Sequence, residues 1–175
     1  DIGNWNTSEV RDMSHMFHKA IKFNKDVGNW NTSKVQIMHM MFQGASVFNL
    51  SINDWNTSSV NNMSYMFNGA SEFNKPLNNW NINNVTNMSY MFNGATAFSQ
   101  DLRNWNVINI TTTPTNFGNS GQDPKWNNGI RYKDNNITIE STSSDLIGKE
   151  MWLLIKPDNT TYKKYLVVDD KNSTE

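Results

Sequence analysis

Apolar residues return along the chain at a fixed spacing of 25 residues. Each unit opens with a branched apolar residue followed three positions later by tryptophan, as in Ile2 and Trp5, and a fifth unit opens at Leu102. Further apolar columns lie at the positions that the first unit fills with Val10, Met13, Met16, Phe17, Ala20 and Phe23. A fixed period of this kind predicts a stack of repeated units, because each unit buries its apolar face only against its neighbours.

Each unit is predicted to contain one helix and one short strand. The apolar residues from Val10 to Ala20 have helical spacing and fall on one side of a helical wheel. The segment around Trp5, residues 2–7, is expected to form a brief parallel strand. The expected fold class is therefore α/β: a leucine-rich-repeat-like solenoid of 25-residue coils, with short parallel strands plus helices, and a small C-terminal β segment.

The repeat decays in the fifth unit, where Pro114 stands at a position that a helix would not tolerate. Farther along, residues 151–155 and 162–168 flank Pro157 and are predicted to form a β-hairpin. We expect a repeat solenoid over residues 1–120, with four full coils and a degenerate fifth. Residues 121–175 would be either a β-hairpin segment that caps the last coil or a small β module.

Composition and charge narrow the function classes. The net charge of −1 disfavours nucleic acid or an anionic membrane as the partner. The absence of cysteine excludes disulfides, thiolate nucleophiles and cysteine-based zinc sites. No apolar run approaches the ~20 residues that span a bilayer, so no membrane insertion is expected. The chain opens on Asp1 without a signal peptide, which we interpret as an excerpt of a longer or processed protein.

The repeat itself resembles a known family. Its pattern is Trp-Asn-Thr-Ser-x-Val-x-x-Met-x-x-Met-Phe-x-Gly-Ala-x-x-Phe-Asn, and it stands in full at residues 30–49. This is similar to the 25-residue repeat of BspA-like surface proteins, which also occurs in mycoplasma lipoproteins, and the resemblance covers residues 1 to about 120. The resemblance implies a leucine-rich-repeat-like fold and an extracellular, cell-surface protein of the adhesion, aggregation or host-matrix-binding kind. It implies no catalytic residues.

Candidate binding residues lie on the predicted outer face of the helices. There, one solvent-facing row is formed by His15, Met40, Tyr65 and Tyr90. Exposed aromatic and methionine side chains are typical anchors of interfaces. The alternative is that Tyr65 and Tyr90 only shield the neighbouring helix, and the sequence leaves the two possibilities equal.

A second candidate set is the most regular polar column, represented by Asn31, Asn56 and Asn81. These asparagines are expected to form a structural ladder, in which side-chain amides bond to the backbone of the next coil. A polar binding face is the alternative. His15, His18 and His39 fall on adjacent coils, but no acidic ligand accompanies them, so we expect no metal site and no cofactor.

No catalytic motif is present, so we expect no enzyme activity and no catalytic residue. The favoured function is a surface interaction or adhesion module that binds a protein or glycan on another cell or in the extracellular matrix. The alternatives are a substrate-holding arm of a larger surface enzyme and a purely structural spacer. Because nothing before Asp1 resembles a polar cap, more units are expected upstream, together with weak self-association through the N-terminal coil.

Overall fold

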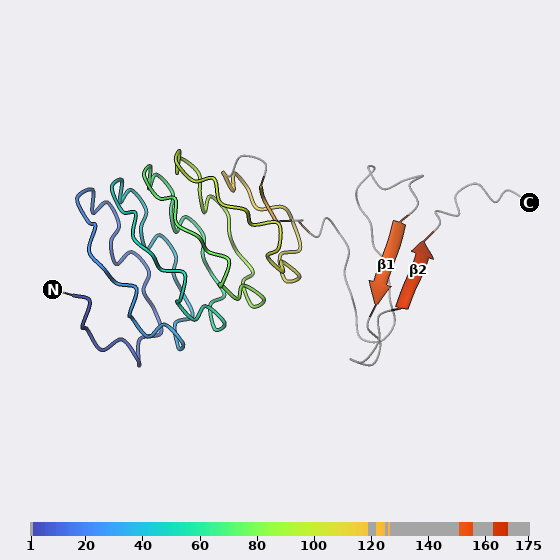
Figure 1. Cartoon of the computed structure of the whole chain (residues 1–175), viewed down its shortest axis with the longest axis horizontal. Coiled ribbons are helices and arrows are strands. Elements are labelled where there is room, and N and C mark those ends of the chain that lie inside the picture. Colours follow the sequence, from blue (N-terminus) through green and yellow to red (C-terminus); the bar gives the residue numbers. More distant parts are fainter. Residues whose placement is uncertain (1, 119–121, 125, 127–150, 156–162, 168–175) are drawn as a thin grey trace, which may run out of the picture. The chain divides into compact units, whose positions relative to one another are not determined.

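The computed structural model describes residues 2–118, 122–124, 126, 151–155 and 163–167. The chain divides into two compact units, Asp1–Asn127 and Asn128–Glu175. The first unit is a stack of coils that follow the sequence repeat (Figure 1). We number the coils by their residues: coil 1 is 2–26, coil 2 is 27–51, coil 3 is 52–76, coil 4 is 77–101 and coil 5 is 102–118.

The predicted helices and strands of the coils are wrong. The described part of the first unit contains no helix and no strand, only turns, bends and isolated bridges. The expected α/β solenoid of helices and parallel strands is therefore not the fold of this chain. Parallel pairing between coils is limited to single bridges, which join Asp12 to Ile37, Ile37 to Asn62 and Asn62 to Asn87.

Coil 3 shows why the segment predicted as a helix is not helical. Backbone N–H groups of Met66, Asn68 and Ala70 each donate to the carbonyl three residues earlier, at 3.0–3.2 Å. The intervening N–H groups of Met63, Tyr65 and Phe67 donate instead to carbonyls of coil 4, at 2.9 Å. A helix needs every N–H to reach the carbonyl four residues earlier, so this alternation excludes it. Successive turns nevertheless return side chains inward every three or four residues, which is the spacing that the sequence shows.

The segment predicted as a strand is also a turn. The backbone N–H of Trp5 donates to the carbonyl of Ile2 at 3.2 Å, and the same bond recurs in the later coils, from Trp30 to Val27 and from Trp55 to Ile52. A strand would send these groups to a neighbouring strand. The coil therefore bends at the tryptophan.

The core consists of the apolar columns of coils 2–5 together with Met13 of coil 1. Tryptophan rings stack along the coils with centroids 6.3 Å apart between Trp80 and Trp105, and 6.4 Å apart between Trp30 and Trp55. The indole Nε1–H of Trp55 donates to the carbonyl of Val27 at 3.0 Å, and Trp30, Trp80 and Trp105 make the equivalent bond. Each tryptophan thus fixes both the apolar contact and a hydrogen bond to the preceding coil.

The second unit contains two strands, β1 (Met151–Ile155) and β2 (Lys163–Val167). They pair antiparallel, with Leu153 opposite Tyr165. The predicted turn around Pro157 lies outside the described residues, as does the predicted boundary at residues 120–121. That this segment caps the coils stays a prediction.

Candidate binding surfaces

At one equivalent position in each of coils 1–4, a large side chain stands on a left-handed backbone, with φ between 56° and 60°, at His15, Met40, Tyr65 and Tyr90. We call these four residues the tyrosine column. Tyr65 is the third residue of the turn from Met63 to Met66, the position where a type II turn requires a positive φ. For an L-residue this conformation costs roughly 1–2 kcal/mol.

A second left-handed position follows four residues later, and there the sequence uses glycine. Gly44, Gly69 and Gly94 have φ between 70° and 75°, whereas coil 1 places Lys19 at this position with φ 59°. Glycine adopts this conformation without steric cost. In coils 2–4, one left-handed position is therefore occupied by glycine, whereas the other is occupied by the large side chains of the tyrosine column.

The side chains of the tyrosine column and its neighbours form a continuous strip of rings. The rings of Tyr65 and Tyr90 stack face to face, with centroids 4.6 Å apart and planes 7° apart. His39 meets Tyr65 edge-on at 5.9 Å, and His15 meets His39 edge-on at 5.3 Å. His15 is exposed, and Met40, Tyr65 and Tyr90 are half-buried, so the strip is accessible from solvent along coils 1–4.

An amide ladder runs beside the tyrosine column. The Nε2–H of Gln43 donates to Oδ1 of Asn68 at 3.2 Å, and Nδ2–H of Asn68 donates to Oδ1 of Asn93 at 3.1 Å. These bonds hold three polar side chains in one row. The strip and its polar flank are thus ordered before any partner arrives.

The asparagine column does not form the ladder that the sequence predicted. Oδ1 of Asn31 accepts from the backbone N–H and the hydroxyl of Ser33 in its own coil, at 3.1 and 2.7 Å. Asn56 does the same with Ser58. The bond to the next coil comes instead from threonine, because the buried Thr57 hydroxyl donates to the carbonyl of Asn81 at 2.8 Å.

An asparagine ladder between coils does exist, but in a column that the sequence prediction missed. The backbone N–H of Asn49 donates to Oδ1 of Asn24 at 3.1 Å, and the N–H of Asn74 donates to Oδ1 of Asn49 at 3.0 Å. The sequence signal for this ladder was the recurrence of asparagine every 25 residues at Asn24, Asn49 and Asn74. Regularity alone did not indicate which asparagine column crosses between coils.

The three histidines gather where coils 1 and 2 meet. His15 and His18 have ring centroids 5.3 Å apart, and Nδ1 of His39 lies 2.7 Å from the Ser64 hydroxyl. Desolvation, then the charges of Lys19 and His15, lower the pKa of His18. Among the residues that the structure describes, no group of three or more acidic or histidine side chains is arranged to hold a metal ion.

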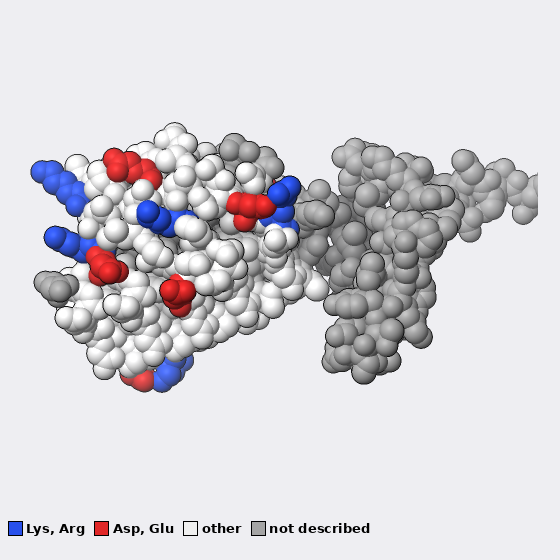
Figure 2. Space-filling view, viewed as in Figure 1, with Lys and Arg blue, Asp and Glu red and all other residues white. Residues whose placement is uncertain are grey.

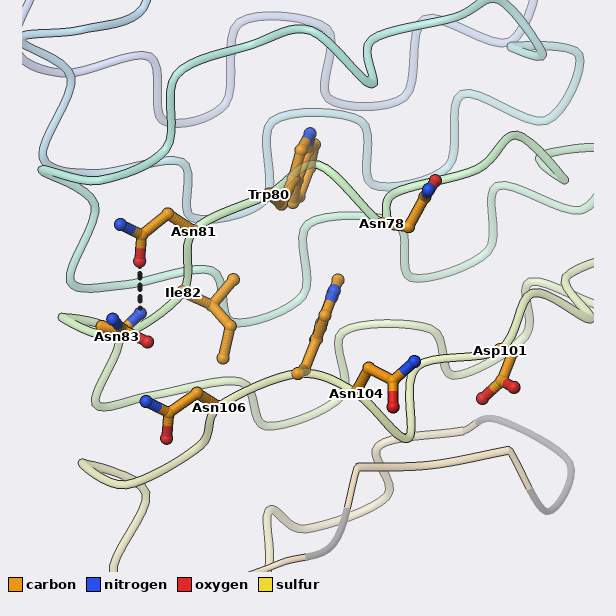
Figure 3. Close-up of a pocket in the computed structure, with 9 residues that line it drawn as sticks. Asn78, Trp80, Asn81, Ile82, Asn83, Asp101, Asn104 and Asn106 are labelled. Atoms are coloured by element: carbon orange, nitrogen blue, oxygen red, sulfur yellow. Dashed lines mark hydrogen bonds between the residues drawn. The ribbon is translucent and has the colours of Figure 1, made fainter. Parts of the chain in front are cut away.

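A pocket of about 270 Å³ lies between coils 4 and 5 (Figure 3). The side chain of Ile82 extends into the space between the two coils, and Asn81 and Asn83 stand beside it. Asp101, the last residue of coil 4, and Asn104 of coil 5 also border the pocket. Hydrogen bonds from Arg103 lower the pKa of Asp101 to about 2, so this carboxylate is ionised at neutral pH.

Charge contributes little to these surfaces. Figure 2 shows a face of the first unit on which uncharged residues predominate and charged residues stand singly or in small mixed groups. Among the residues with a described structure, two exposed ion pairs are formed, Lys34 with Glu9 and Arg103 with Asp101. In the parts of the chain with a described structure, no helix has the length and apolar character needed to cross a membrane.

The turn-rich repeat is recognised by one family model, that of DUF285, described as a Mycoplasma protein of unknown function. Its matches, to residues 1–53 and 26–128, together span residues 1–128 of the 175-residue chain. The chain belongs to the DUF285 family. The DUF285 match ends at the boundary between the two compact units. No curated protein and no solved structure matches the chain.

Proposed function

We propose that this DUF285 chain is an extracellular, cell-surface interaction module that binds a partner protein through the tyrosine column. The family match and the similarity of the repeat to BspA-like surface proteins support a surface role of the adhesive kind. The observation that carries the proposal is the backbone conformation of His15, Met40, Tyr65 and Tyr90.

Residues held in costly backbone conformations cluster at functional sites, where the surrounding structure maintains them. Stacking of Tyr65 on Tyr90 recovers about 0.5–1.5 kcal/mol, which is of the same size as the conformational cost at one residue. The net contribution of a tyrosine ring to stability at this position is therefore small, and stability does not explain why a large ring stands where glycine would fit. Recognition of a partner explains it.

The chemistry of the strip favours a protein as its partner. Tyrosine, histidine, asparagine and serine predominate on and beside it, and tyrosine provides rigid contact area at a low entropic cost. The tyrosine rings are stacked against each other, so they present edges and hydroxyls more than open ring faces. Such a surface suits a protein interface with an aromatic centre and a polar rim.

Surface plasmon resonance with the immobilised chain tests the proposal against a panel of extracellular-matrix proteins and against detergent-solubilised surface proteins of cells. The variant is Tyr65→Ala with Tyr90→Ala, which should weaken binding by about tenfold or more. The control is Ile21→Ala with Ile108→Ala, because these residues are exposed by 59% and 45% and lie outside the column.

The control variant should bind as the unchanged chain does. Equal binding by both variants would refute the tyrosine column as the interface and would favour either of the two remaining roles, a substrate-holding arm or a structural spacer.

A further inference from the structure

Coil 4 departs from coils 1–3 where the threonine column should continue. Thr7, Thr32 and Thr57 each donate a hydroxyl hydrogen bond to a carbonyl of the next coil, at 2.8–3.1 Å. Coil 4 has Ile82 at this position, and isoleucine has no hydroxyl to donate. The coil 4–5 junction therefore lacks a bond that every earlier junction has, and the 270 Å³ pocket lies at this junction.

In the adjacent asparagine column, the side chains of coils 4 and 5 make fewer local hydrogen bonds than those of the earlier coils. The side chains of Asn31 and Asn56 accept from both a backbone N–H and a serine hydroxyl. Among the described residues, the side chain of Asn81 accepts only from the backbone N–H of Asn83, at 3.1 Å. Asn106 makes no side-chain hydrogen bond to any residue that the structure describes. The asparagine column is thus structural in coils 1–3 and free to bind a ligand at coil 5.

The pocket combines these amides with apolar surface. Ile82, Trp80 and Trp105 supply its apolar part. Asn104 and Asn106 lie beside them on the ribbon of coil 5 (Figure 3). Each carboxamide offers two donors and an acceptor. Among the described lining residues there is no lysine or arginine, and the one carboxylate, Asp101, is paired with Arg103.

We propose that the coil 4–5 pocket binds one neutral sugar ring of a glycan. Sugar hydroxyls both donate and accept hydrogen bonds, as the carboxamides do, and the C–H face of a sugar ring matches the apolar edges of isoleucine and tryptophan. The volume lies just below the ~300 Å³ at which ligand pockets begin, which suits a single ring. Asp101 is paired with Arg103, so the carboxylate of an acidic sugar would meet no free cation among the described lining residues and would lose its hydration without compensation. This site is separate from the tyrosine column and independent of the function proposed for it.

Titration of the full chain with methyl glycosides of neutral hexoses and N-acetylhexosamines tests this site. Binding is followed by saturation-transfer NMR and by tryptophan fluorescence. At least one neutral glycoside should bind saturably, and the methyl glycoside of glucuronic acid should bind more weakly. Asn104→Ala with Asn106→Ala should weaken binding by tenfold or more without changing the melting temperature, because both residues are exposed and make no side-chain bond to a described residue.

The matched control is Asn31→Ala, which should lower the melting temperature and leave sugar binding unchanged. The Tyr65→Ala, Tyr90→Ala variant should also bind the sugar normally, which separates this test from that of the protein interface. The proposal is overturned if no neutral glycoside saturates by about 10 mM, if Asn31→Ala weakens sugar binding as much as the pocket variant, or if the capped peptide acetyl-triglycine amide binds more tightly than every sugar.

Discussion

Coils 1 and 3 have apolar residues in the same columns, but the exposed fractions of these side chains differ between the two coils. Trp5 is 53% exposed and Met16 is 39% exposed, whereas Trp55 and Met66 of coil 3 are 2% and 0% exposed. The ring of Phe67 stacks on phenylalanines of two neighbouring coils, Phe42 at 5.7 Å and Phe92 at 5.4 Å. Burial in this fold therefore depends on a neighbour on each side, and the repeat sequence alone does not secure it.

Truncating one methionine in each coil gives the largest effect expected from this comparison. Met66→Ala should lower the free energy of unfolding by about 2–5 kcal/mol, because it leaves a cavity between two coils. Met16→Ala should cost less than half as much, since that side chain is already partly in solvent. Chemical denaturation of both variants measures the difference. Equal losses would contradict the dependence on neighbours on both sides.

At the second left-handed position, Lys19 in coil 1 and Gly69 in coil 3, two substitutions are expected to change stability in opposite directions. Lys19→Gly should stabilise coil 1 by about 1 kcal/mol, because φ is 59° at this residue and glycine removes the steric cost. Gly69→Ala should destabilise coil 3 by about 1 kcal/mol through φ alone, since an added Cβ meets no atom closer than 3.8 Å. Thermal unfolding of the two variants compares them. A loss of stability in Lys19→Gly would show that the lysine side chain stabilises coil 1 by other contacts.

The smallest expected effect is a pH dependence of stability that arises from His18 in coil 1. Desolvation and nearby Lys19 and His15 hold the pKa of His18 below its ordinary value of 6.5. The unfolded chain then takes up this proton more readily than the folded chain, so the stabilising contribution is complete above pH 6.5 and is lost as pH falls through the lower, folded value. The melting temperature should fall slightly between pH 7.5 and 5. The same scan on His18→Gln should be flatter, and an unchanged slope would exclude His18 as the cause.

The sequence predicted the apolar columns well, because the period holds through the stack and each position repeats its environment. It also grouped Tyr65 with Tyr90, whose rings stack at 4.6 Å. The local structure was mispredicted because consecutive β-turns and a helix place apolar residues at the same spacing. Poor helix formers within the segment, such as Asn62, Ser64 and Gly69, were the signal against a helix.

The pocket could not be predicted in the same way. Its position depends on how coils 4 and 5 approach each other, which no column of the repeat encodes. The sequence signal was the loss of threonine from its column at Ile82 and again at Val107. A residue that departs from the repeat indicates that the surroundings of that position differ from those in the other coils. Whether a cavity results depends on the geometry of the neighbouring coil.

In the function proposed above, the large side chains of the tyrosine column bind a partner and impose a conformational cost on the backbone. Comparing Tyr65→Gly with Tyr65→Ala tests it most directly, because both variants lose the ring and only glycine relieves the left-handed φ of 59°. We expect Tyr65→Gly to be about 1 kcal/mol more stable than Tyr65→Ala in chemical denaturation, and both variants to lose affinity for the partner protein equally. A glycine variant that is no more stable than the alanine variant, or that retains full binding, would contradict it.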